Sequence, residues 1–77
     1  MGNEIEKPFD ALNQAKGKRV MVELKNGRKF AGVLKAFDIH INMVLEDVEE
    51  IEGEGVKRTF KRVFIRGDTI LYVMLVE

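Results

Sequence analysis

The sequence predicts a mainly β fold: a short N-terminal helix followed by five antiparallel strands that are strongly bent into a small barrel. Apolar residues occur at helical spacing only in residues 8–16. After that segment they alternate with polar residues or form short runs, separated by turn sequences such as Asn26-Gly27. Residues 29–38 have apolar side chains on both faces and contain Gly32, which marks a bulge or sharp bend and is typical of a small barrel.

The helix is predicted for residues 8–16. Pro8 fits the first helical turn, where its missing N–H costs nothing. Phe9 and Leu12 fall on one face, and Gly17 can adopt the left-handed conformation that ends many helices. Since the rest of the chain is predicted to be strand, the apolar face of this helix has to lie on the sheet.

Five strands are predicted after the helix, each followed by residues that favour turns. Asn26-Gly27 suits the tight turn of a hairpin, and residues 53–55 provide a flexible glycine turn. The predicted strands cover residues 19–25, 29–38, 43–52, 56–65 and 69–76, and Arg66-Gly67-Asp68 is the last turn.

The last strand contains an apolar run, residues 70–76, with no charge before Glu77. An open edge strand of this composition would be prone to aggregation. Two interpretations follow: the strand pairs with a neighbouring subunit, or it is a central strand of the chain's own barrel. We favour subunit pairing, because a five-stranded barrel has two edges and a 77-residue chain with 0 cysteines has few other sources of stability.

Length and composition exclude several classes of protein. A chain of 77 residues is expected to form one domain, here residues 8–77, after a flexible N-terminus of residues 1–7. With 0 cysteines and 1 histidine, a disulfide framework or a Cys- or His-rich metal cage is excluded, and no metal or cofactor is expected. No signal-peptide core or membrane-length apolar segment is present, so we expect a cytoplasmic protein with no membrane partner. The 13 basic residues balance the 13 acidic ones, so any nucleic-acid site has to be a local concentration of charge.

Opposite charges flank the glycine turn between the third and fourth strands. Residues 46–54 are rich in Asp and Glu, and residues 57–62 are rich in Lys and Arg. Opposite charges across a hairpin each contribute roughly 0.2–1 kcal/mol. The pattern therefore favours a solvated, charge-matched hairpin over a metal site or an RNA site. The pairs expected to face each other are Glu50 with Arg58 and Asp47 with Lys61.

Two polar segments, residues 38–42 and 66–68, are not explained by the strand pattern. Each joins two consecutive strands, and alternate turns of a meander lie at the same end of the sheet, so the two segments are expected to converge. His40 offers an imidazole plane and Arg66 a guanidinium plane on which a base can stack. Together they indicate a binding site for an unpaired nucleotide base.

Asn42 carries a donor and an acceptor on one amide, which match the N3–H edge of uracil and the carbonyl beside it. Cytosine presents the opposite pattern, so a fixed amide would distinguish the two bases. Asp68 is expected to orient Asn42 or Arg66. Structural explanations also remain open: a local hydrogen bond between His40 and an Asp, a left-handed backbone at Asn42, and Arg-Gly-Asp as a common turn.

Two motifs in this chain resemble those of the Sm-like (LSm) proteins. The first lies within residues 22–45, and the second is Ile65-Arg66-Gly67-Asp68 followed by apolar residues. The resemblance spans roughly residues 8–76 and is strongest to the archaeal branch of the family. The residues that match the first motif are Val22, Leu24, Gly27, Phe30, Gly32, Leu34, Phe37, Asp38, His40, Asn42, Val44 and Leu45.

The resemblance implies the Sm fold, an SH3-like five-stranded barrel capped by the helix. It also implies a homo-oligomeric ring, usually heptameric, in which strand four of one subunit pairs with strand five of the next. The implied function is binding of uridine-rich single-stranded RNA in RNA processing or ribonucleoprotein assembly. The implied RNA-binding residues are His40 and Arg66 (stacking), Asn42 (base edge), Asp68 (support), Asp38 (loop geometry) and the motif residue Gly67.

Two other functions remain open at this level. The chain could be an SH3-like structural or protein-interaction barrel without RNA specificity. It could also be an RNA chaperone of the Hfq type, usually hexameric, although that family's second motif normally has a Lys-His pair in place of Arg-Gly-Asp. An enzyme is not expected, because His40 is the sole histidine, there is no serine or cysteine nucleophile, and no phosphate-cradling loop is present.

Overall fold

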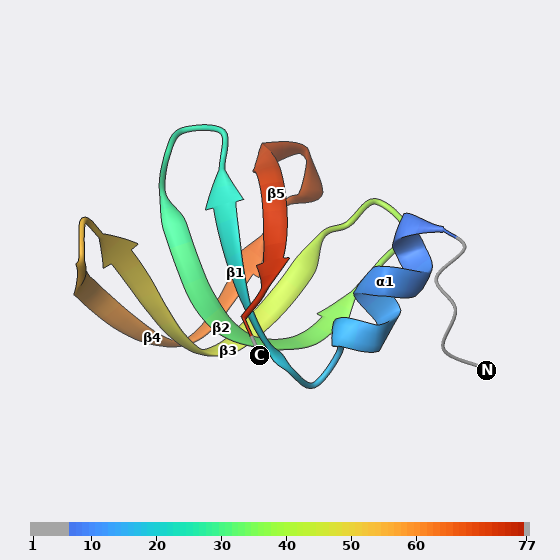
Figure 1. Ribbon diagram of the computed structural model, residues 1–77, viewed down its shortest axis with the longest axis horizontal. Helices are drawn as coiled ribbons and strands as arrows, with labels where there is room; N and C mark the ends of the chain where they lie inside the picture. Colours follow the sequence, from blue (N-terminus) through green and yellow to red (C-terminus); the bar gives the residue numbers. More distant parts are fainter. Residues whose placement is uncertain (1–6, 77) are drawn as a thin grey trace.

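The helix and five strands occur in the predicted order (Figure 1). The computed structural model describes residues 7–76, so the predicted flexible N-terminus lies outside the described residues except for Lys7. No predicted element bound differs from the observed one by more than one residue. The elements are α1 (Pro8–Ala15), β1 (Arg19–Leu24), β2 (Lys29–Phe37), β3 (Met43–Glu52), β4 (Gly55–Ile65), the short 3-10 helix η1 (Gly67–Thr69) and β5 (Ile70–Leu75).

All five strands form one antiparallel sheet in the order β4-β3-β2-β1-β5. Figure 1 shows β2, β3 and β4 strongly curved, with β5 beside β1 and α1 at one end of the sheet. Among the described strands, β4 and β5 do not pair with each other, so the bent sheet is an open barrel. β5 is therefore an edge strand, and the interpretation of it as a central strand of the chain's own barrel is wrong.

The sheet bends where Gly32 of β2 faces β3. On β2, Ala31 and Val33 are two residues apart, whereas their partners on β3, Glu49 and Glu46, are three residues apart. β3 therefore has one extra residue here, and the bulge predicted near Gly32 lies in the strand opposite it. A Cβ on Gly32 would lie 3.0 Å from the carbonyl oxygen of Glu46. Glycine is therefore favoured here because β3 approaches its backbone closely.

The core is built from alternate residues of the strands, as the two-residue period of a strand requires. α1 closes one side of it: Leu12 packs against the core, and the ring of Phe9 meets that of Phe37 edge-on at 5.1 Å between centroids. After α1, Gly17 has φ 86°, which confirms the predicted left-handed exit. No helix within residues 7–76 is long and apolar enough to cross a membrane. The buried core residues are Ala15, Val20, Val22, Phe30, Leu34, Met43, Leu45, Val48 and Ile65.

Candidate functional site

The β2–β3 loop (residues 38–42) and the β4–β5 connection (residues 66–69) meet in space. The Gly67 N–H donates a hydrogen bond of 2.7 Å to Oδ1 of Asn42, although the two residues are 25 positions apart. A Cβ on Gly67 would lie only 1.9 Å from the carbonyl oxygen of His40. Glycine is therefore required where the two segments touch, a role for Gly67 that the sequence pattern did not identify.

Asp38 organises the β2–β3 loop through three hydrogen bonds. Its Oδ1 accepts from the backbone N–H of His40 (2.9 Å) and of Asn42 (3.1 Å). Its Oδ2 accepts from Nδ2 of Asn42 at 3.1 Å. The bond from the Asn42 side chain, together with those from the two backbone N–H groups, holds the pKa of Asp38 below its ordinary value and outweighs partial desolvation. Asp38 therefore shapes the loop in its ionised form.

The orientation of the Asn42 amide follows from the chemistry of its two partners. A carboxylate only accepts hydrogen bonds and a backbone N–H only donates one, so Nδ2 has to face Asp38 and Oδ1 has to face Gly67. One N–H of Nδ2 and one lone pair of Oδ1 are not used in these bonds. They remain as a donor and an acceptor on an amide whose orientation is set by the loop.

Ile41, at the turn of this loop, has a strained backbone. Its φ is 64°, a left-handed value that β-branched residues rarely adopt. Ile41 and Asp47 are the non-glycine residues with positive φ in the described chain, so the left-handed backbone considered for Asn42 is not observed. The Ile41 N–H donates to the carbonyl oxygen of Asp38 at 2.9 Å, and its side chain packs against the core. Packing and hydrogen bonding thus hold the loop in a strained shape, as is common at functional sites.

Three more of the predicted site residues are exposed around this junction: His40, Arg66 and Asp68. Nη2 of Arg66 lies 3.0 Å from Oδ2 of Asp68, so of the two partners considered for Asp68 the one it contacts is Arg66. Asp38, Asn42 and Arg66 help to line an open cavity of about 370 Å³, and His40 is not part of its lining. The six predicted residues therefore come from two chain segments and lie at one junction.

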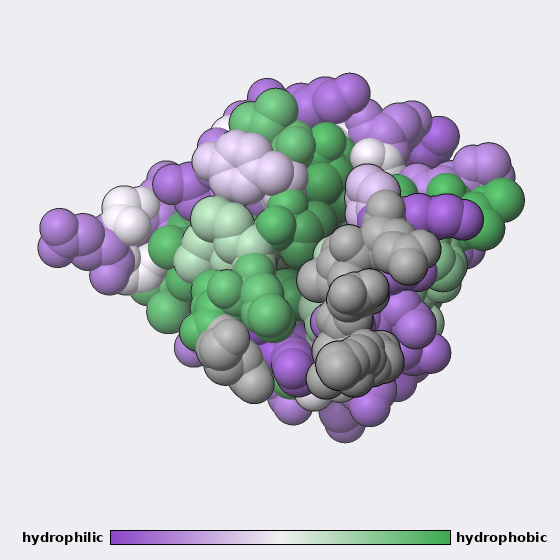
Figure 2. All heavy atoms as spheres, turned by 45° about the vertical axis from the view of Figure 1, so that its right-hand side comes forward, coloured by the Kyte–Doolittle hydropathy of each residue, from purple (hydrophilic) through white to green (hydrophobic). Residues whose placement is uncertain are grey.

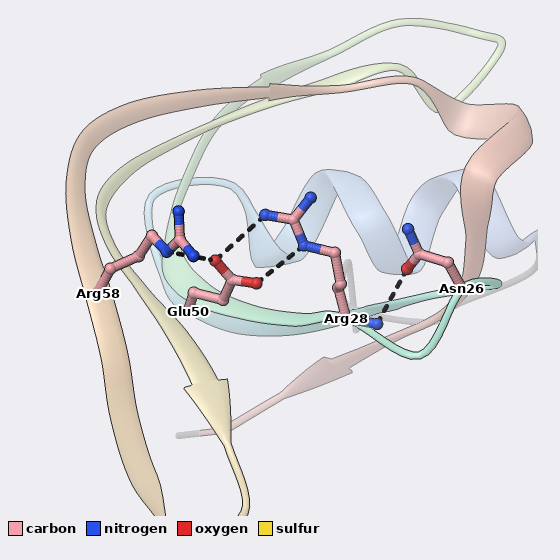
Figure 3. Close-up of polar contacts among 4 residues, drawn as sticks. All are labelled: Asn26, Arg28, Glu50 and Arg58. Atoms are coloured by element: carbon pink, nitrogen blue, oxygen red, sulfur yellow. Dashed lines mark hydrogen bonds and ion pairs between the residues drawn. The ribbon is translucent and has the colours of Figure 1, made fainter.

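A second polar cluster, formed by Arg28, Glu50 and Arg58, was largely missed by sequence reasoning. Glu50 is 2% exposed although it is acidic. Arg28 donates to both of its carboxylate oxygens, from Nε to Oε2 at 2.8 Å and from Nη2 to Oε1 at 3.2 Å. Nε of Arg58 lies 3.3 Å from Oε1, and Figure 3 shows the two guanidinium groups converging on the carboxylate. The hydrogen bond between Arg28 and Glu50 holds the pKa of Glu50 below its ordinary value. The same bond holds the pKa of Arg28 above its ordinary value.

The prediction of a solvated, charge-matched hairpin is wrong at Glu50 in one respect, because this residue is buried. Met43 and Leu45 face the core, and strict alternation along β3 would bring residue 47 and then residue 49 to that face. The bulge at Asp47, where φ is 53°, shifts the alternation so that Val48 and Glu50 face inward instead. Glu50 therefore needs cationic partners, and Arg28 supplies one from a segment 22 residues away.

The predicted register of the β3–β4 hairpin is otherwise observed. Glu50 lies opposite Arg58, and the expected pair Asp47 and Lys61 lies between two observed register pairs. Those observed pairs are Glu46 with Arg62 and Val48 with Phe60.

Within residues 7–76, no group of three or more His, Asp or Glu side chains is placed to hold a metal ion.

The two edge strands leave apolar side chains exposed. On β4, Phe64 is 75% exposed. Figure 2 shows hydrophobic side chains gathered in the middle of one face, with hydrophilic ones above and to the left of them. An edge with unpaired backbone groups and apolar side chains is a surface suited to pairing with another strand. The exposed apolar residues on and just after β5 are Leu71, Tyr72, Met74, Leu75 and Val76.

Comparison with known sequences gives one consistent group of relatives. A family model described as the LSM domain matches residues 10–75. An snRNP Sm-like protein of Methanococcoides burtonii is 44% identical over 73 residues, which cover 95% of this chain and 97% of that protein.

Comparison with solved structures finds the same fold. A Pyrococcus abyssii Sm protein, solved in complex with a uridine heptamer, is similar with a TM-score of 0.88 and 38% identity, over 92% of this chain and 100% of that one. The SmAP1 heptamer of P. aerophilum has a TM-score of 0.87 and 31% identity, over 96% of this chain and 99% of that one.

Proposed function

The chain belongs to the Sm-like (LSM-domain) family, and we propose that it forms a homo-oligomeric, heptameric ring that binds uridine-rich single-stranded RNA without catalysing a reaction. The observation that carries this proposal is the Asn42 amide, fixed between Asp38 and Gly67 with one donor and one acceptor unused. The uridine heptamer bound by the Pyrococcus protein and the heptameric state of the P. aerophilum protein support it. The role proposed for the ring is RNA processing or ribonucleoprotein assembly in the cytoplasm.

The two edges of the sheet supply the surfaces for the ring. β4 of one copy pairs with β5 of the next, so every copy uses the same two edges and the chain of contacts closes by rotation. This pairing covers apolar side chains such as Phe64 and Leu71. β4 has 11 residues and β5 has 6, so part of β4 stays outside the joint.

Recognition of uracil uses the junction of the two loops. The unused donor and acceptor of Asn42 pair with one carbonyl and the N3–H of uracil, and His40 and Arg66 stack on the base from its two faces. Cytosine has an amino group in place of the O4 carbonyl and an acceptor at N3, so it meets donor with donor and acceptor with acceptor. Asp68 holds the Arg66 guanidinium in orientation.

Energetics explain why the site needs a ring. A base stacked on planar side chains gains about 1–3 kcal/mol. Even with hydrogen bonds to Asn42, one such site binds at roughly millimolar concentration. Repeating the site around a ring makes the later contacts intramolecular and adds roughly two to four orders of magnitude in affinity.

Native mass spectrometry with a uridine heptamer and a cytidine heptamer tests the proposal. The expected result is a ring that retains the uridine oligomer and not the cytidine oligomer. A monomer contradicts the ring, and a ring that takes up neither oligomer contradicts RNA binding and favours a protein-interaction barrel.

Substitution of the base-reading residue tests the mechanism. Asn42→Ala is expected to keep the ring and to reduce the preference for uridine over cytidine by about tenfold or more, since a paired donor and acceptor distinguish bases by about 1–3 kcal/mol. Asn13→Ala is the matched control, because Asn13 is an exposed residue of α1 outside the junction. Unchanged selectivity in Asn42→Ala would remove the base-reading role.

A further inference from the structure

The cluster of Arg28, Glu50 and Arg58 contains more cationic groups than its buried carboxylate needs. Arg28 alone donates to both oxygens of Glu50. Arg58 adds a longer contact of 3.3 Å to an oxygen that already has a partner. Of the five N–H donors of a guanidinium, Arg28 uses two in hydrogen bonds to Glu50, whereas Arg58 makes an ion pair with it. Most of the donors are therefore left for another acceptor.

The two guanidinium groups are positioned but accessible. The carboxylate of Glu50 lies between the two guanidinium groups (Figure 3). The side chains of Arg28 and Arg58 are 49% and 52% exposed, whereas Glu50 is buried. Arg28 also lies over the ring of Phe30, with 5.1 Å between the guanidinium carbon and the ring centroid. A planar fork that is already held in place loses little side-chain entropy when it binds a second oxyanion.

An open cavity of about 260 Å³ adjoins this cluster. Arg28, Lys29 and Lys57 bring positive charge to its lining, against the carboxylates of Glu50 and Glu52. The lining therefore has three cationic side chains against two carboxylates, and Arg58 contacts Glu50 from outside the lining. The local charge is therefore positive although the chain is neutral, and a nucleic-acid site on a neutral chain requires such a local excess.

We propose that the Arg28–Glu50–Arg58 cluster binds phosphate groups of the RNA strand, as a second contact separate from the uridine junction. Guanidinium groups match phosphate oxygens in a bidentate geometry, and phosphate contacts position a strand without reading its sequence. Buried Glu50 sets the directions of both forks. This inference rests on the proposed RNA binding and adds to it a sequence-independent backbone contact.

An RNA that reaches both the cluster and the uridine junction has to be longer than one that occupies the junction alone. Asn42 and Glu50 are eight positions apart on the β3 side of the sheet, at most about 26 Å at roughly 3.3 Å per residue. A strand that reaches both sites in a ring gains additional intramolecular contacts. Long oligouridine is therefore expected to bind more tightly and with a steeper salt dependence than the heptamer.

The test measures the affinity of the ring for a uridine heptamer and for a longer oligouridine across a salt series, in wild type and Arg58→Gln. Arg58 is the residue to change, because Arg28 still satisfies Glu50 in the variant. Arg62→Gln is the matched control: it is on the same strand, 58% exposed, and pairs with Glu46 instead. Native mass spectrometry checks that both variants remain rings.

For Arg58→Gln, the expected result is about three- to tenfold weaker binding of the longer RNA and a salt slope smaller by about 0.7 for each phosphate that is no longer neutralised. Binding of the heptamer is expected to stay unchanged, and Arg62→Gln is expected to change neither. Equal losses in Arg58→Gln and Arg62→Gln overturn the proposal, because the effect is then one of net charge. A wild-type ring that does not bind the heptamer at any salt concentration is instead the failure of the proposed function.

A second measurement distinguishes RNA from free inorganic phosphate as the ligand of the cluster. It compares Tm with and without inorganic phosphate at matched ionic strength. A rise in Tm with phosphate that is absent in Arg58→Gln, together with the length effect on RNA, supports a phosphate site used by RNA. The same rise without any length effect overturns RNA as the source of the phosphate.

Discussion

The two carboxylates Asp38 and Glu50 have different structural roles in one small sheet. Asp38 is exposed and accepts hydrogen bonds from residues two and four positions ahead in the same loop. Glu50 is buried and is bound by guanidinium groups from residues 22 positions before and 8 positions after it. The pKa of each is lowered, the first by amide donors and the second by cations.

This difference separates the shape of a loop from the stability of the sheet. The bonds to Asp38 are local, so losing them alters the loop and leaves the strands paired. The bonds to Glu50 join Arg28, just before β2, to β3 and β4. Losing Arg28 leaves the buried carboxylate with only the longer contact to Arg58. Changes at the two carboxylates should therefore affect different measurements.

The largest effect on stability is expected for Arg28→Ala. The substitution removes the residue that binds both oxygens of buried Glu50, and Tm is expected to fall on the order of 10 °C. Arg62→Ala is the control, because it removes an ion pair that is exposed, and its Tm is expected to change by about 2 °C or less. Thermal unfolding of the two variants measures the difference, and equal changes in Tm would contradict the assigned role of burial.

The largest effect on binding is expected for Gly67→Ala. Its Cβ would collide with the carbonyl of His40 at 1.9 Å, so the two loops have to separate and oligouridine affinity is expected to fall about 100-fold or more. Gly55→Ala is the matched control, since a Cβ there meets nothing within 4 Å. Fluorescence anisotropy with a labelled uridine heptamer measures both. Retained affinity in Gly67→Ala would show that the junction does not form the site.

Asp38→Asn is expected to have a smaller effect on binding, about tenfold weaker uridine affinity with Tm nearly unchanged. The new amide can no longer accept from both the loop backbone and Asn42 Nδ2. Asp47→Asn removes the same charge at an exposed residue of β3 whose positive φ suits Asn, and it is expected to bind like wild type. A large fall in Tm for Asp38→Asn would place Asp38 in the stability of the sheet instead.

The smallest effect is expected on acidification. Because the folded pKa of Asp38 is lowered, its contribution is complete above its ordinary value of 3.8 and is lost as pH falls through the lower folded value. The same holds for Glu50 below its ordinary value of 4.5. Loop and sheet are therefore expected to be unchanged from neutral pH down to about 4.5.

NMR separates the two carboxylates in acid. The amide signals of His40 and Asn42 report the protonation of Asp38, and this step is absent in Asp38→Asn. Loss of dispersed strand signals reports unfolding of the sheet, which protonation of Glu50 promotes. A midpoint for the Asp38 step above its ordinary value of 3.8 would contradict the lowered pKa.

The elements of the fold could be predicted because local signals determine them. Pro8 and Gly17 bound the helix, and Asn26-Gly27 sets the first hairpin. The remaining differences of one residue occur at the ends of elements. At Asp38, for example, the backbone N–H still bonds to the carbonyl oxygen of Asn42 opposite it, but β2 ends one residue earlier, at Phe37.

The residues of the junction could also be named from the sequence, but not how they contact one another. Residue type alone indicates that Asn42 can read a base edge and that His40 and Arg66 can stack. That Gly67 closes on the His40 carbonyl and that Ile41 takes the strained backbone depends on distances between two loops far apart in the chain.

The sequence by itself therefore determined the helix, the strands and their order, the residues at the junction and the β3–β4 register, since each depends on neighbours along the chain or directly across a turn. Only the tertiary structure decided that Glu50 is buried, that Arg28 is its main partner and that β5 lies at an edge. The physical reason is that alternation gives two faces to a strand, and a single bulge, at Asp47, exchanges them. Which face is inward, and which distant cation then compensates a buried charge, is settled when the strands pack together.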